Sequence, residues 1–290
     1  MSSKSLTLFD LAPGKDLLGQ YKIRRSHRQG GMSTTFEVDD AKRNAVCEVQ
    51  VFPAALFENR QQAQEFGESL RAWTRVDSKH VLAARDVHAL EDGSILFVTD
   101  MPSGHSLREW QRTHHVCDPA TVIEIGKQLL EGLAAIHAAG LVHGDIKPHT
   151  IHIDEKKKPH IVLVDGGITP GLWTAKHLGD KTALIGTPFY APIEQFGGES
   201  PNVQSDVYNV ATVLYELATG VIPWKGKSFI EVFQSKLEKA PPAMRVRAPK
   251  VEVPSELESA IAGGLMADKG DRYATADEFK KRLVAARKGS

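Results

Sequence analysis

Two short stretches near the middle of the chain carry side chains that could do chemistry. Residues 143–150 read HGDIKPHT, which brings Asp145, Lys147 and Thr150 close together. Residues 164–167 read VDGG and supply a second carboxylate, Asp165, beside two glycines. Carboxylate and hydroxyl oxygens are ligands that Mg²⁺ accepts, and a carboxylate can also take the proton of a reacting hydroxyl. The residue types could therefore supply ligands to a metal ion and a carboxylate beside a reacting hydroxyl group.

The elements that must position these residues change in character along the chain. Residues 45–52 alternate in polarity and stop at Pro53, which is typical of a strand. Asp118 and Pro119 predict the N-cap and first residue of a long helix with an apolar stripe that ends at Gly140. Further helices are expected at 58–76, 205–219 and 276–286, and strands at 94–99, 151–153 and 161–164. A β-rich first third and a helical remainder predict an α+β fold in two lobes.

A third stretch, residues 186–194 (GTPFYAPIE), follows the first two along the chain. Together with 143–150 and 164–167 it resembles the end of the activation loop, the catalytic loop and the Mg²⁺-binding loop of bacterial-type Ser/Thr protein kinases. Other landmarks of that family are matched by Gly30 and Gly31 in the glycine-rich loop, Glu68 in the αC helix, 205–208 and 214–220 in the αF helix, and Arg272 as partner of Glu194. The resemblance implies one kinase-like domain at 20–287, with an N-terminal tail at 1–19, an N-lobe at 20–102 and a C-lobe at 103–290.

The resemblance also shows where the nucleotide chemistry departs from the family pattern. Gln50 stands where the family has the lysine that contacts the phosphates, so the positive charge is lost and Glu68 loses its ion-pair partner. Removal of one preorganised transition-state donor typically costs about 2.7–4 kcal/mol. Arg28 and Ser33 replace the first and last glycines of the glycine-rich loop, and each adds a Cβ where backbone normally closes over phosphate.

Further replacements affect the metal site and the adenine site. Thr150 stands for the metal-binding asparagine of the catalytic loop, Gly144 for the arginine before the aspartate, and Gly166 for a phenylalanine. Polar residues take the positions that sandwich adenine, where burial of an unpaired charge is unfavourable. These polar positions are Thr35, Glu48 and His152, and the degenerate nucleotide site implied by the resemblance comprises Gly30, Gly31, Arg28, Gln50, Glu68, Thr99 and Met101. We therefore expect an adenine pocket that is unbuilt or filled by side chains.

Three functions remain open at this point. The first is a catalytically impaired pseudokinase, a signalling scaffold or allosteric regulator with no cofactor, in which Asp145 and Lys147 only hold the loop. The second is an active but atypical Ser/Thr protein kinase that transfers the γ-phosphate of ATP to a protein hydroxyl. It would use Arg28 in place of the lysine, with Mg²⁺ held by Asp165 and Thr150. The third is a small-molecule phosphotransferase, which residues 143–145 also resemble but residues 186–194 do not favour.

Bulk composition narrows the class of partner. Lys plus Arg and Asp plus Glu each number 36, so the formal net charge of zero gives no indication of a nucleic acid or an anionic membrane as partner. The apolar runs are shorter than the ~18 residues that a membrane helix needs, and two cysteines give no disulfide framework. We expect a cytoplasmic protein without membrane insertion, whose partner is a kinase or another signalling protein. The pathway and the oligomeric state stay open.

Overall fold

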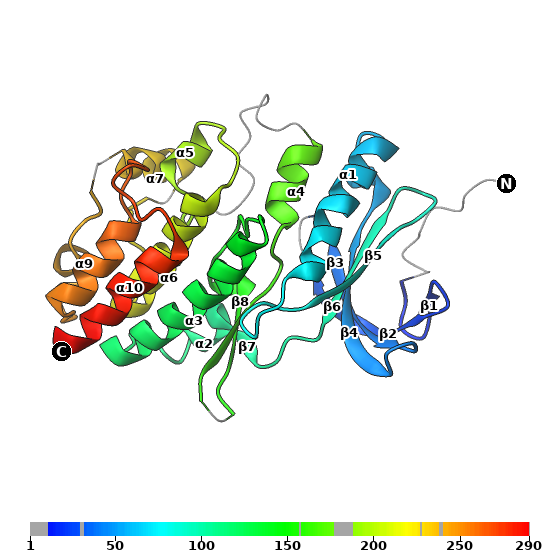
Figure 1. Ribbon diagram of the computed structural model, residues 1–290, viewed down its shortest axis with the longest axis horizontal. Helices are drawn as coiled ribbons and strands as arrows, with labels where there is room; N and C mark the ends of the chain where they lie inside the picture. The colour runs from blue at the N-terminus through cyan, green and yellow to red at the C-terminus, as the bar shows by residue number, and fades with distance from the viewer. Residues whose placement is uncertain are drawn as a thin grey trace. The chain divides into compact units, whose positions relative to one another are not determined.

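The computed structural model describes residues 11–29, 32–156, 158–176, 188–226, 228–237 and 240–289. Its contacts divide the chain into two compact units. The first unit comprises residues up to Asp77, Leu82–Pro102 and Thr174–Lys176, and the second comprises Ser78–Val81, Ser103–Trp173 and the residues from His177 onward. The first is built mainly of strands and the second mainly of helices (Figure 1), so the predicted α+β class is confirmed.

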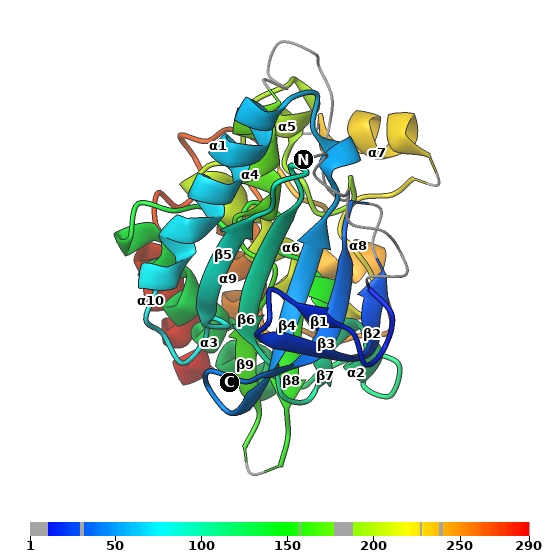
Figure 2. The ribbon, with the colours of Figure 1, turned by 90° about the vertical axis from the view of Figure 1, so that its right-hand side faces the viewer.

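The first unit is an antiparallel sheet of six strands in the order β1-β2-β3-β4-β6-β5 (Figure 2). The strands are β1 (Asp16–Leu17), β2 (Tyr21–Gln29), β3 (Thr34–Asp40), β4 (Ala45–Phe52), β5 (Ala84–Ala89) and β6 (Ile95–Asp100). The helix α1 (Arg60–Arg71) packs against β5, and short 3₁₀ turns occupy Ala54–Leu56 and Ala72–Arg75. The helix expected at 58–76 is therefore an α-helix that tightens into a 3₁₀ turn over its last residues.

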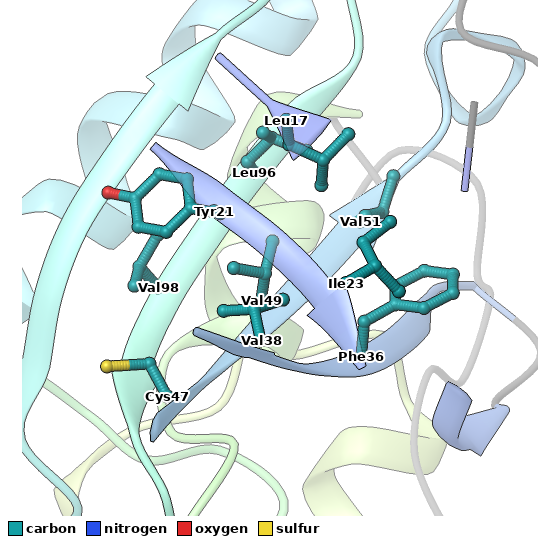
Figure 3. Packing of buried hydrophobic residues seen from close by; sticks show 10 residues of the cluster. All are labelled: Leu17, Tyr21, Ile23, Phe36, Val38, Cys47, Val49, Val51, Leu96 and Val98. Atoms are coloured by element: carbon teal, nitrogen blue, oxygen red, sulfur yellow. The ribbon is translucent and has the colours of Figure 1, made fainter. Parts of the chain in front are cut away.

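The core on one face of this sheet explains the alternation seen in the sequence. Cys47, Val49 and Val51 of β4 point into a cluster that also contains Leu17 and Tyr21 (Figure 3). Successive side chains of a strand point to opposite faces, so Glu48 and Gln50 lie on the other face of the sheet. The expectation of a tail at 1–19 is wrong for its last part, because β1 pairs with β2 and Leu17 is buried. Residues 1–10 lie outside the described residues.

The second unit combines a small three-stranded sheet with a helical body. The sheet has the order β7-β8-β9, formed by β7 (His105–Ser106), β8 (Ile151–Asp154) and β9 (His160–Leu163). The helices are α2 (Leu107–Trp110), α3 (Pro119–Ala138), α4 (Ile168–Ala175), α5 (Ile193–Phe196), α6 (Val203–Thr219), α7 (Phe229–Lys236), α8 (Met244–Arg247), α9 (Ser255–Gly264) and α10 (Ala276–Ala285), with 3₁₀ turns at Pro148–Thr150 and Ala286–Gly289. The last residues of α4 belong to the first unit by their contacts.

Capping residues mark the ends of α3 and α6, the two long helices of the second unit. Asp118 is the N-cap of α3, as predicted, and its side chain accepts a hydrogen bond from the Thr121 amide. Asn202 caps α6 in the same way, and Gly220 ends α6 with the left-handed backbone that favours glycine. Almost every residue of α6 is buried. α6 is therefore the central helix around which the loops that carry Asp145 and Asp165 are built.

Candidate active site

The first group of candidate residues lies on the polar face of β4. The register places Glu48 directly between Glu37 of β3 and Thr99 of β6. The Gln50 side-chain amide donates a hydrogen bond to the Ser33 hydroxyl at 2.8 Å. Gln50 thus donates to a neutral residue just before β3, and position 50 supplies no positive charge.

Glu48, at one of the positions expected to contact adenine, is the buried member of an ionic cluster. Its side chain is 3% exposed, and its two oxygens lie 3.1 Å from an Arg28 guanidinium nitrogen and 3.2 Å from His27 Nε2. A buried carboxylate is tolerated only when it is paired in this way. The cationic side chain that the second hypothesis assigns to phosphate is here bound to Glu48. His27 was missed by sequence reasoning, because only the strand register places it near residue 48.

The other residues of the first unit that were predicted to form the nucleotide site lie further apart. Glu68 lies on the exposed face of α1, and its carboxylate makes no hydrogen bond or ion pair within the part of the chain that the structure describes. Thr99 lies opposite Glu48 on β6, and Met101 follows the end of β6 and is half-buried. Gly30 and Gly31 lie outside the described residues. Of this set, the structure places Arg28 and Thr99 next to Glu48, and Glu68 lies apart from them.

The second group of candidate residues is held by Asp206, a fully buried carboxylate of α6. It accepts hydrogen bonds from the backbone amides of His143 and Gly144, both at 2.8 Å, and lies 3.0 Å from His137 Nε2. These bonds fix the start of the loop at 143–150. The His143 ring in turn donates from Nε2 to the carbonyl of Val164 at 3.0 Å. The loop at 143–150 and the one at 164–167 are therefore tied together beneath the candidate residues.

His143 is best suited to a structural role. Burial lowers the pKa of its imidazole, which favours the neutral form. With Nε2 protonated toward Val164, Nδ1 is an acceptor, and the Asp145 amide faces it at 3.4 Å. His143 therefore orients the backbone at Asp145.

Asp145 and Lys147 form a close pair at the loop surface. Lys147 Nζ lies 2.6 Å from Asp145 Oδ2, and each side chain is 20% exposed. The Thr150 hydroxyl is buried and donates to the Asp145 carbonyl at 2.8 Å, while it accepts a bond from the Lys147 amide at 3.1 Å. Thr150 thus supports the loop backbone. Its assignment as a metal ligand stays a prediction that this geometry does not favour.

Asp165 adopts an uncommon backbone conformation. Its φ of 60° lies in the left-handed region, which non-glycine residues seldom occupy, although aspartate does so more often than most. The conformation is fixed on both sides, since the Val164 amide donates to the Thr150 carbonyl and the Gly167 amide to the His143 carbonyl. Such a conformation costs about 1–3 kcal/mol and is found at functional sites. Across the described ranges, no set of three or more His, Cys, Asp or Glu side chains forms a metal site.

Comparison with known proteins identifies the family of the chain that contains these loops. The model of the protein kinase domain family matches residues 21–283, almost the whole chain. The chain belongs to the protein kinase family. It is 27% identical over 280 residues to the serine/threonine-protein kinase pkn3 of Myxococcus xanthus, covering 95% of this chain and 51% of that protein. It is 29% identical over 258 residues to PknL of Mycobacterium tuberculosis, covering 89% of this chain and 63% of that protein.

Solved structures agree on the fold. The PknI kinase domain of Mycobacterium tuberculosis superposes with a TM-score of 0.74 at 19% identity, covering 96% of this chain and 99% of that one. At this identity the likeness supports the fold alone. The kinase domain spans only about half to two thirds of the length of these curated relatives. No helix among the residues described is both long and apolar enough to cross a membrane.

One landmark of this kinase domain was predicted and is confirmed. Arg272 and Glu194 form a two-pronged ion pair, with nitrogen–oxygen distances of 2.7 and 3.2 Å. The side chains are 0% and 6% exposed. The pair joins the segment that ends at α5 to the loop between α9 and α10. Gly186 and Thr187, at the start of the same predicted stretch, lie outside the described residues.

Steric contacts explain why the residue before Asp145 is a glycine. Gly144 has a φ of 82°, and a Cβ at this position would lie 2.4 Å from Pro170 Cγ. Any side chain here would collide with the first turn of α4 and would also be strained by the backbone. The arginine that the family has at this position is therefore excluded by Pro170, a relation that the sequence alone did not reveal.

Proposed function

We propose that this kinase domain acts as a pseudokinase, a scaffold or allosteric regulator that binds a protein partner and carries out little or no phosphoryl transfer. The observation that carries the proposal is the buried Glu48 carboxylate, which is paired with the partly exposed side chains of Arg28 and His27. An adenine ring at this face would meet a desolvated carboxylate, and Arg28 could reach phosphate only if Glu48 lost its partner. Gln50 adds to the argument, because it is neutral and bonded to Ser33.

The donor set fits ATP and Mg²⁺ poorly. Asp165 could hold a metal ion, but the Thr150 hydroxyl is engaged with backbone groups of its own loop. Position 50 supplies no charge to offset the phosphates, and transfer of a phosphoryl group depends mostly on positioning and charge neutralisation. We therefore expect no resident cofactor. The two free cysteines, Cys47 and Cys117, support a cytoplasmic setting as part of the proposal.

A second candidate function is an active atypical Ser/Thr protein kinase. The relatives support it better than the first proposal, because each is named a serine/threonine-protein kinase. Two observations in the second unit favour it as well. Asp145 keeps a paired lysine 2.6 Å away, and Asp165 has the left-handed conformation of a fixed functional residue. If the domain is active, Asp145 would orient the acceptor hydroxyl, Asp165 would bind Mg²⁺, and Arg28 would supply the missing charge.

Thermal unfolding with ATP, first in Mg²⁺ and then in EDTA, separates these functions. A ligand at a hundred times its Kd stabilises a fold by about 2.7 kcal/mol, a rise in Tm of roughly 5–10 °C at 2–4 °C per kcal/mol. The pseudokinase proposal expects no rise in either buffer, and no radiolabelled phosphate on the chain or on a test protein. Incorporation that is abolished by Asp145→Asn and by Arg28→Ala, but not by Gln50→Ala, would establish the second function and refute the first.

A further inference from the structure

A buried lysine links α7 to the segment that precedes α5. Lys236 is the last residue of α7 and only 1% exposed, which is rare for a lysine. Its Nζ donates to the carbonyls of Ala191 at 2.8 Å and Phe189 at 3.3 Å, and lies 3.2 Å from the Tyr208 hydroxyl. An ammonium group has three donors, and these three oxygens match them.

Aromatic rings complete the surroundings of this ammonium group. Nζ lies 4.9 Å from the ring centre of Tyr208, 5.8 Å from that of Trp224 and 6.0 Å from that of Phe196. Ring faces within about 6 Å attract a cation, and more strongly when it is desolvated. The geometry is therefore that of a cation site whose cation belongs to the chain itself.

The charged and titratable groups that face Lys236 come from three elements. They are the Glu194 carboxylate of α5, the Arg272 guanidinium and the Tyr208 hydroxyl of α6. The Glu194 carboxylate is bonded to Arg272, and among the described residues Lys236 forms no ion pair with a carboxylate. Burial lowers the pKa of Lys236 well below its ordinary value, Glu194 raises it and Arg272 lowers it. An apolar side chain of similar length would avoid this desolvation, so stability alone does not explain a lysine here.

We propose that Lys236 is a positioning residue whose ammonium group clamps the backbone at 189–191 to the end of α7. The clamp keeps this backbone, α5 and α7 in one fixed arrangement before any partner binds. Ile230 in the first turn of α7 is 64% exposed and Leu237, the residue directly after Lys236, is 60% exposed, so both ends of α7 present an apolar side chain from this fixed position. The clamp is a property of the chain alone. Only its use in partner binding rests on the proposed function.

The test compares Lys236→Met with Lys225→Met by hydrogen exchange of the whole chain. Methionine keeps the length and apolar character of the side chain, and Lys225 is an exposed lysine near α7. The reporters are the amides of Gln195 and Gly197, which bond to Pro192 and Glu194. We expect at least tenfold faster exchange at these amides and in α7 for Lys236→Met, an unchanged rate for Lys225→Met, and a Tm of Lys236→Met that does not fall.

A second measurement needs no variant. The pKa of Lys236 is lowered well below the ordinary lysine value of 10.5, so the ammonium group loses a donor as pH rises through the range below 10.5. The exchange of the Gln195 and Gly197 amides, corrected for its intrinsic pH dependence, should then rise, while α3 stays protected. Equal protection of these amides in Lys236→Met and wild type, or a flat corrected pH profile, would overturn the clamp. So would a loss of protection spread evenly over the second unit. None of these readouts depends on ATP. The clamp can therefore be refuted while the proposed function stands, and the proposed function can be refuted while the clamp stands.

Discussion

The ion pair of Glu194 and Arg272 allows a quantitative test of how this domain holds the segment around α5. Both side chains are almost completely buried, and the shorter of their two contacts is 2.7 Å. Arg272 also donates to the carbonyls of Met266, Ala267 and Gln204. Glu194→Gln would remove the only carboxylate in contact with this guanidinium among the described residues. The cation would then be buried with neutral acceptors alone.

The expected cost follows from the burial. Removal of one partner of a buried pair costs about 3–5 kcal/mol, because the other charge is left uncompensated. Three backbone acceptors remain to Arg272, so we expect about 3 kcal/mol for Glu194→Gln, or a fall in Tm of roughly 6–12 °C at 2–4 °C per kcal/mol. Arg272→Met should cost at least as much, since it strands the Glu194 carboxylate and frees three carbonyls. The double variant should cost less than the sum by at least about 1.5 kcal/mol.

Urea unfolding followed by tryptophan fluorescence gives each free energy, and the four proteins form a double-mutant cycle. Lys269→Met is the matched control, because it breaks an ion pair with Glu199 whose side chains are 40% and 52% exposed. Exposed pairs contribute about 0–1 kcal/mol. A cost for Glu194→Gln as small as that of the control, or a coupling energy below about 0.5 kcal/mol, would refute the view that this buried pair fixes the segment.

Three further predictions concern other parts of the chain. Gly144→Ala should destabilise the domain by at least about 2 kcal/mol in urea unfolding, because the new Cβ meets Pro170 and the backbone is left-handed; an unchanged midpoint would contradict this. Asp118→Ala should cost about 1 kcal/mol, because the N-cap bond to Thr121 of α3 is lost, whereas Asp118→Asn should cost less. Burial, then Asp86 and Asp40, raise the pKa of Tyr21 from 10.0 to about 12. The stability that this raised pKa provides should be complete below about pH 10 and should be lost as pH rises through about 12. Absorbance at 295 nm reports the ionisation of tyrosine, and urea unfolding at each pH reports the stability. Tyr21→Phe is the control.

The parts of the fold that could be predicted are those set by local signals. Asp118 and Pro119 identified the start of α3, and Gly220 the end of α6, because caps depend on a few neighbouring residues. The pair of Glu194 and Arg272 was predicted correctly, although the residues lie far apart in sequence. That prediction came from the family pattern, since no local rule connects the two positions.

The parts that could not be predicted depend on contacts between distant segments. β1 lies in what seemed a tail, because Leu17 contributes a single apolar side chain to a core built by other strands. The partners of Glu48 depend on the register between β2, β3 and β4, which shifts at irregularities in β2. Lys236 stands in the sequence SKLEK, where it resembles any surface lysine. Its burial follows from rings on other elements.

The polar replacements in the first unit form a mutually compensating set. Glu48 lies opposite Glu37 across β3 and β4, and like charges opposite one another destabilise a sheet. Arg25 binds the Glu37 carboxylate at 2.7 Å, while Arg28 binds Glu48. Each acid is thus tolerated because a neighbouring strand brings its own arginine. The basic residues of β2 therefore serve to balance the sheet. A lysine at position 50 alone would add a positive charge to a surface on which Arg25 and Arg28 already pair with Glu37 and Glu48.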